Sequence, residues 1–296
     1  MRTNTIYIAR LLIVSLLMTG LLLITVNTAS AQAGAGFTNA SLKGNYATFN
    51  IGRGGYLPQV GISVASYDGK GNFSGTTIQD VPGSGNRARV FLKTTFNGTY
   101  AVDANGTGTG SITTNLPDGS KHQVNIVFAI TAAEMLGGVK IATEFSFIHE
   151  TLSLTGNLFT LVATRLPDGG KFTNASLKGN YAYTLIGRGG PLPQSGVGLM
   201  NYDGKESFSG TAIVNLPGPT FGARAFVTAP FVRPYTVNPD GTGTATPPGE
   251  SDIAFVITKA DLVGDIKVAR EVFFIVRELN AVTGNLLTGV IKKLPD

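Results

Sequence analysis

The chain has 296 residues, of which 43% are hydrophobic and 14% charged, with a formal net charge of +5 and no cysteine. The lack of cysteine excludes disulfides, thiolate metal sites and a cysteine nucleophile. Its Lys and Arg residues form no basic run, so we expect no nucleic-acid partner.

The N-terminal segment has the parts of an export signal. Arg2 and Arg10 supply positive charge, and the apolar run 11–26 that follows is short for a membrane span. The small residues of 29–31 predict cleavage after Ala31, with Ala33 as the alternative site. We therefore predict that 1–31 is a signal peptide and that the protein is secreted or periplasmic, with no stable membrane span after cleavage. An uncleaved N-terminal anchor is the competing interpretation.

The rest of the chain is an internal duplication. The segment 37–47 returns letter for letter as 172–182, at an offset of 135 (172 − 37). Phe128 aligns with Phe255 at an offset of 127, because eight residues (135 − 127) around 116–122 have no counterpart in the second copy. We predict two repeat domains, 37–168 and 172–296.

Short runs of β-branched and aromatic residues, separated by Gly, Asn-Gly and Asp-Gly, predict an all-β fold. The connections are short, so consecutive strands pair antiparallel, and closure would hide the sheet edges. We predict two tandem antiparallel up-and-down β-barrels of about eight strands each. A two-sheet sandwich is the alternative, and one porin-like barrel fits less well because the last strand has no aromatic residue. In the first repeat the predicted strands are 44–52, 60–67, 72–79, 87–95, 98–102, 108–115, 123–130, 140–148 and 158–165.

Two segments carry local predictions. The capping-box spacing of Thr131 and Glu134 predicts a single helical turn between two strands, repeated at 258–261. Pro230 and Pro234 stand where the first repeat has threonines, so we predict a disrupted strand in the second repeat.

Four short motifs carry a family resemblance: Ser-Leu-Lys-Gly-x-Tyr at 41–46, Tyr-Asp-Gly-Lys at 67–70, Phe-Ser-Gly-Thr at 73–76, and the Gly-Thr-Gly-Thr that ends 100–109. The chain thereby resembles secreted bacterial proteins with lipocalin-like or allene oxide cyclase-like β-barrels. The resemblance implies a barrel and no settled activity, and no cyclase catalytic residue matches this sequence.

The sequence offers little for catalysis. His122 falls in the segment missing from the second repeat, and His149 aligns near Val276, so no histidine is shared. We interpret both as surface histidines and predict no catalytic residue, no metal site and no cofactor. The glycines of 52–55 and 83–88 precede no helix, which argues against phosphate binding.

Charged and aromatic residues that both repeats keep are the candidate ligand contacts. If their faces point inward, they would anchor a small molecule inside a barrel. The alternative is a structural ion pair or a solvated face. The candidates are Tyr46, Arg53, Arg89, Glu144, Tyr181, Arg188, Arg224 and Glu271.

These patterns favour an exported, non-enzymatic protein that binds a small apolar or amphipathic ligand in one or both barrels. A structural or cell-surface interaction protein with solid barrels is the first alternative. An enzyme with an allene-oxide-cyclase-like cavity is the second.

Overall fold

The computed structural model describes residues 36–54, 58–82, 89–150, 156–188, 193–218, 220, 222–245, 252–277 and 286–295. The predicted signal peptide, 1–31, lies outside these residues. Within the described ranges, no helix combines the length and hydropathy needed to cross a membrane.

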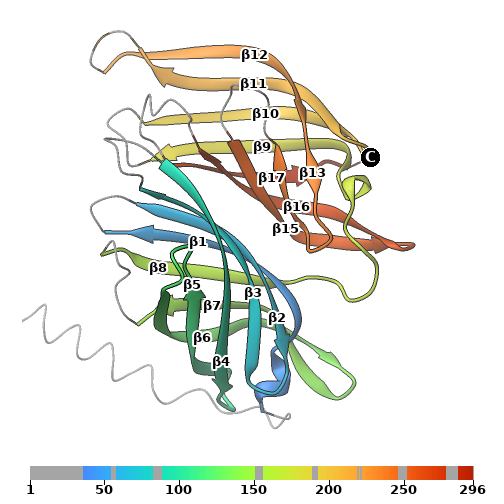
Figure 1. Ribbon diagram of the computed structural model, residues 1–296. Helices are drawn as coiled ribbons and strands as arrows, with labels where there is room; N and C mark the ends of the chain where they lie inside the picture. The colour runs from blue at the N-terminus through green and yellow to red at the C-terminus, as the bar shows by residue number, and fades with distance from the viewer. Residues whose placement is uncertain are drawn as a thin grey trace, which may run out of the picture. The chain divides into compact units, whose positions relative to one another are not determined.

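The first repeat forms a closed antiparallel barrel in which each strand pairs with the next and the last pairs with the first. Figure 1 follows it from blue through green. The predicted strands 87–95 and 98–102 merge into one. The strands are β1 (Lys43–Arg53), β2 (Gln59–Asp68), β3 (Asn72–Pro82), β4 (Arg89–Val102), β5 (Thr107–Asn115), β6 (Lys121–Leu136), β7 (Val139–His149) and β8 (Leu158–Arg165).

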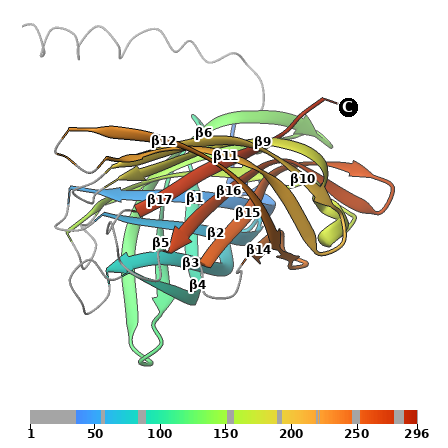
Figure 2. The same ribbon diagram turned by 90° about the horizontal axis from the view of Figure 1, so that it is seen from above.

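The second repeat forms a curled nine-stranded sheet in the order β12-β11-β10-β9-β17-β16-β15-β14-β13, visible in yellow to red in Figure 2. The prediction of two tandem antiparallel barrels is confirmed, the first closed and the second curled with β12 and β13 at its edges. The strands are β9 (Lys178–Arg188), β10 (Gln194–Asp203), β11 (Ser207–Pro217), β12 (Arg224–Pro234), β13 (Thr236–Val237), β14 (Thr242–Ala245), β15 (Asp252–Val263), β16 (Ile266–Arg277) and β17 (Leu286–Lys293).

The predicted proline disruption is also confirmed. The single strand β4 of the first repeat corresponds to two strands, β12 and β13, divided after Pro234. A proline cannot donate a hydrogen bond to a ladder and is therefore tolerated at a sheet edge. Pro230 and Pro234 lie on β12, the edge strand, where they pair with β11.

The predicted helical turn is wrong. Residues 131–134 belong to β6, and 258–261 belong to β15. Each strand has a bulge here, and in β6 the Thr131 hydroxyl donates across it to Glu144 Oε1 at 2.9 Å. The long hairpin satisfies the backbone with cross-strand hydrogen bonds, which outweigh an isolated turn. The capping boxes of the described chain lie instead at two 3-10 turns, η1 (Asn39–Ser41) and η2 (Asn174–Ser176).

The duplicated segment that begins each repeat closes one end of its sheet. The Asn39 side chain accepts a hydrogen bond from the backbone of Val102 at 2.8 Å, and the Tyr100 hydroxyl donates to the carbonyl of Leu42 at 2.7 Å. The second repeat copies both bonds, from Val237 to Asn174 at 2.7 Å and from Tyr235 to Leu177 at 3.0 Å. We call this segment the plug (37–42, and 172–177 in the second repeat). Its side-chain and backbone hydrogen bonds fix it to the strands in the same way in both repeats.

The outer faces of the two sheets pack on each other within the compact unit Gly36–Asp296. Strands β15 and β16 lie against β1 and β2. The rings of Phe49 and Phe273 stack at a centroid distance of 4.4 Å, and Ile62 and Val256 are completely buried. One apolar cluster therefore continues from the outside of the first barrel into the second sheet.

Candidate functional site

The first barrel contains a cavity of about 510 Å³. All eight strands contribute to its lining. Its residues come mostly from the start of β2, β6 and β8 and from the end of β3, β5 and β7, which is the end of the barrel opposite the plug. Side chains alternate along a strand, so the inward residues of each strand line the cavity.

The floor and walls of the cavity are mainly aromatic and aliphatic. Tyr67 and Phe73 stack at 4.8 Å, and Phe96 meets Phe73 edge-on at 6.2 Å. Burial raises the pKa of Tyr67, so its hydroxyl stays protonated. Further wall residues are Leu92, Ile112, Val124, Phe147, Phe159 and Leu161.

An unpartnered amide lies on one side. Asn50, on β1, is only 4% exposed, and its Oδ1 has no hydrogen-bond partner among the described residues. Its cross-strand neighbour is Gly61. A Cβ at Gly61 would lie 2.7 Å from Asn50 Nδ2, so this glycine makes room for the amide. A buried acceptor without a donor costs free energy unless a ligand or water supplies one.

Both histidines of the chain line this cavity, His122 from β6 and His149 from β7. The His149 ring lies 5.0 Å from the Phe159 ring, and its Nδ1 is buried without a hydrogen-bond partner in the described structure. Burial, and secondarily the charge of His122, lowers the pKa of His149 to about 4, so this imidazole is neutral at pH 7.

The interpretation of these histidines as surface residues is therefore wrong for His149. That interpretation assumes that any functional residue occurs in both repeats. Since neither His122 nor His149 has a histidine counterpart in the second repeat, the assumption rules both out as site residues. The useful signal is that a chain with two histidines places both in one repeat. The described residues hold no cluster of three or more His, Asp or Glu side chains suited to a metal ion.

Arg89 and Arg224 form equivalent structural clamps. Arg89 donates from Nε to Asp80 Oδ1 at 2.8 Å and from a terminal nitrogen to the carbonyl of Pro58 at 2.9 Å. Arg224 repeats this with Asn215 Oδ1 at 2.7 Å and with the Pro193 carbonyl at 2.7 Å. Arg89 thereby joins β3 and β4 to the segment before β2, and Arg224 joins β11 and β12 to the segment before β10.

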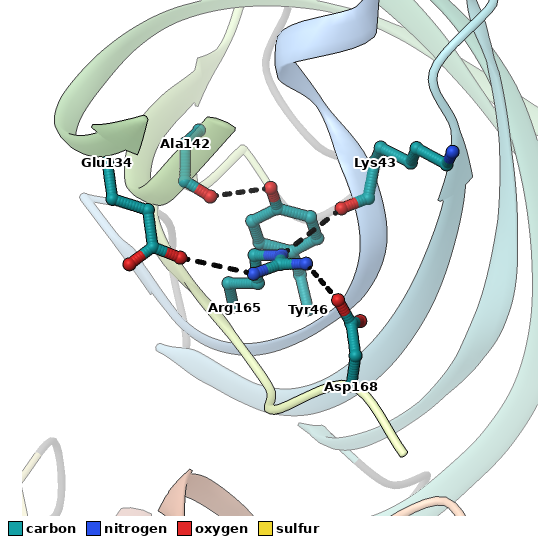
Figure 3. Close-up of polar contacts among 6 residues, drawn as sticks. All are labelled: Lys43, Tyr46, Glu134, Ala142, Arg165 and Asp168. Carbon is teal, nitrogen blue, oxygen red and sulfur yellow. Dashed lines mark hydrogen bonds and ion pairs between the residues drawn. The ribbon is translucent and has the colours of Figure 1, made fainter. Parts of the chain in front are cut away.

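Tyr46 and Tyr181 lie toward the plug end of their sheets. The Tyr46 hydroxyl donates to the carbonyl of Ala142 at 2.7 Å, as Figure 3 shows. Tyr181 donates to the equivalent carbonyl, of Ala269, at 3.1 Å. Beside Tyr46, the Arg165 guanidinium contacts Asp168, Glu134 and the carbonyl of Lys43 (Figure 3), which fixes the end of β8.

The remaining candidates lie on the periphery. Glu144 bonds to Thr131, and Glu271 lies 3.5 Å from Lys259 Nζ and 3.6 Å from Lys292 Nζ. Arg53 is exposed at the end of β1, and the Arg188 side chain lies outside the described part. None of the eight sequence candidates is among the lining residues of the cavity.

The polar lining belongs to the first repeat. Gln59 has a matching residue, Gln194, in the second repeat. The segment that carries His122 is missing there. Tyr67 is also kept, as Tyr202. Five further polar positions turn apolar or lose the side chain: Asn50, Ser63, Thr77, Gln79 and His149 correspond to Leu185, Gly198, Ala212, Val214 and Val276.

No protein-family model matches the chain, and no curated protein sequence is similar to it. Among solved structures, the haemoglobin receptor HpuA from Kingella denitrificans in complex with human haemoglobin is 12% identical, with a TM-score of 0.28, covering 83% of this chain and 91% of its own. Its apo structure gives the same identity and TM-score, with coverage of 83% and 90%. A porin-like protein from Bacteroides uniformis is 7% identical, with a TM-score of 0.18, covering 86% and 99%. These scores are low, so the function has to come from the cavity itself.

Proposed function

We propose that the first barrel binds a small, neutral, amphipathic molecule and that the second repeat is its structural partner. The observation that supports this most is the cavity of about 510 Å³, since the second repeat lacks most of the polar residues that line it. Ligand sites are concave, mainly apolar and furnished with a few polar groups that fix orientation. An interior of this size also favours binding over a solid structural barrel.

The lining defines the chemistry of the ligand. The aromatic walls suit a flat apolar body. Among the described residues, the lining holds one carboxylate, Asp118, and no lysine or arginine, so none of them offers an anion a permanent positive charge. Asn50 Oδ1 and His149 Nδ1 are the two buried lining atoms without partners in the described structure. We therefore infer a ring compound that carries hydroxyl or amide groups.

The test replaces the polar lining with the residues that the second repeat already uses. The triple variant Asn50→Leu, Gln79→Val, His149→Val should lose at least tenfold in affinity for ligands found by a thermal-shift panel and measured by calorimetry. Its free energy of unfolding should be unchanged or higher, by about 1 kcal/mol, because the two unsatisfied buried atoms disappear. Arg224→Ala, outside the cavity, is the matched control and should bind like the unmodified protein. Equal binding by the triple variant would overturn the proposal.

A further inference from the structure

The second sheet exposes a copy of the surface that the first barrel buries. In the first repeat, the outer face of β1–β4 (the β1–β4 face) contains Ile51, Ile62, Val64, Ile78 and Phe91, and it packs in the apolar cluster that joins the sheets. The aligned residues of β9–β12 (the β9–β12 face) lie on one side of the sheet by their pairing. They are Ile186, Val197, Leu199, Ile213 and Phe226.

The burial of the two copies differs sharply. Val64 is 8% exposed, whereas its counterpart Leu199 is 60% exposed, and Phe226 is 76% exposed. Val232, on the same side of β12, is exposed as well. A contiguous apolar face of this kind on a sheet marks an interaction surface.

The surface that covers the β1–β4 face also has an exposed copy. The outer face of β15–β16 (the β15–β16 face) presents apolar side chains to the first barrel, and the aligned face of β6–β7 (the β6–β7 face) includes the exposed Val127 and Ile148. The chain therefore carries one free copy of each half of its own internal contact. The aligned sets are Ala254, Val256, Phe273 and Ile275 on the β15–β16 face and Val127, Ala129, Ser146 and Ile148 on the β6–β7 face.

Where an aromatic residue of one buried face is replaced on its free copy, its stacking partner on the other buried face is replaced as well. The stacked pair Phe49 and Phe273 of the internal contact corresponds to Thr184 and Ser146 on the free faces. Both rings are lost together, so two hydroxyl side chains would meet where two rings stack.

Two ion pairs lie beside the internal contact. Asp80 pairs with Arg89 on the first barrel. Arg277, from the second sheet, lies 5.4 Å from the Phe91 ring and pairs with Asp252. Each of these two pairs is neutral.

On the free faces the charges change together. Asn215 replaces Asp80 beside the kept Arg224, so a neutral ion pair becomes a site with a net charge of +1 on the β9–β12 face. Glu150 and Asn125 replace Arg277 and Asp252, so a neutral pair becomes a site with a net charge of −1 on the β6–β7 face. These two changes are opposite in sign.

We propose that the β9–β12 face binds the β6–β7 face of a second copy of this chain, repeating between molecules the contact that joins the two repeats within one. The two faces are different surfaces, so the contact is head-to-tail. Such contacts build a ring when the rotation closes and an open chain when it does not.

Sedimentation of the protein purified from its host tests this. The unmodified protein should form species larger than a dimer as its concentration rises. Leu199→Asp on one face and Ile148→Asp on the other should each give monomers. Mixed together they should give a dimer and nothing larger, because one intact face of each kind remains.

Exchange of the charged residues is the second measurement. Asn215→Asp removes the net positive charge and should weaken association at least fivefold. Adding Glu150→Arg together with Asn125→Asp should restore it, because both faces then carry the neutral ion pairs of the internal contact. Thermal melts check that each variant is folded.

Several results would overturn the proposal. One is a monomer at every concentration, and another is a dimer that survives Ile148→Asp but not Leu199→Asp, since that pattern means the β9–β12 face pairs with itself. Monomers that bind lipid vesicles through Leu199 would assign the face to a membrane surface instead.

Discussion

At the scale of single residues, the two repeats differ most where side chains enter the barrel. Asn50 and His149 keep buried polar atoms without partners in the described structure, whereas Leu185 and Val276 fill the aligned positions with apolar groups. Buried polar atoms without partners are destabilising. Their presence in the first repeat alone is therefore consistent with a ligand-binding role for the first barrel.

His149 makes stability depend on pH. Its pKa is about 4 in the folded protein against 6.5 as the ordinary value, so the unfolded chain binds more protons between these values. The contribution of His149 to the free energy of unfolding is therefore fully present above about pH 6.5 and is lost as the pH falls toward 4. Its neighbours at the cavity are His122 on β6, Asp118 in the preceding turn and Phe159 on β8.

Denaturant melts across this pH window measure the effect. We expect a loss on the order of 2 kcal/mol in the unmodified protein, discounted for partial exposure. His149→Val should remove most of it, and His122→Gln should keep most of it. An unchanged pH dependence in His149→Val would show that other groups are responsible.

At the scale of elements, the plug is the feature that both repeats preserve. Asn39 and Asn174 make the same bond to strand backbones, at 2.8 and 2.7 Å. We expect Asn39→Ala and Asn174→Ala each to lower the free energy of unfolding by about 1–2 kcal/mol, since a part-buried backbone N–H loses its acceptor. Thermal and denaturant melts measure this. Ligand affinity should not change in Asn39→Ala, and a loss of affinity without a loss of stability would contradict a purely structural plug.

The elements are largely predictable from the sequence, because β-branched runs and turn glycines act locally. Pro234 ends a strand as expected, since proline acts through its own backbone. The prediction at Thr131 is wrong because a capping-box spacing is also compatible with a strand. The residues 131–134 form a strand because they pair with β7, and this pairing is not visible in the local sequence.

The cavity lining is harder to predict for a related reason. Period two shows which residues share a face, but not which face closes inward. Arg89 therefore looks like a ligand contact in the sequence, although it clamps the outer side of the barrel. Asn50 and His149 differ between the repeats, so a comparison that keeps only shared residues passes over them.

At the scale of the whole molecule, duplication separated two roles. The first barrel has a mainly apolar cavity with a few polar groups, and the second sheet covers the outer face of this barrel through Phe273 and Val256. The same geometry leaves a free copy of each contact surface. The proposed ligand binding and the proposed head-to-tail association should be independent, because the lining of the cavity and the two free faces share no residue.

The most direct test of the central claim is native mass spectrometry of the protein purified from its own host. We predict one bound small molecule per chain, which is absent from the triple variant Asn50→Leu, Gln79→Val, His149→Val. Two molecules per chain would contradict the assignment of binding to the first barrel alone. A ligand-free mass, together with no response to a panel of neutral amphipathic compounds, would contradict the binding function itself.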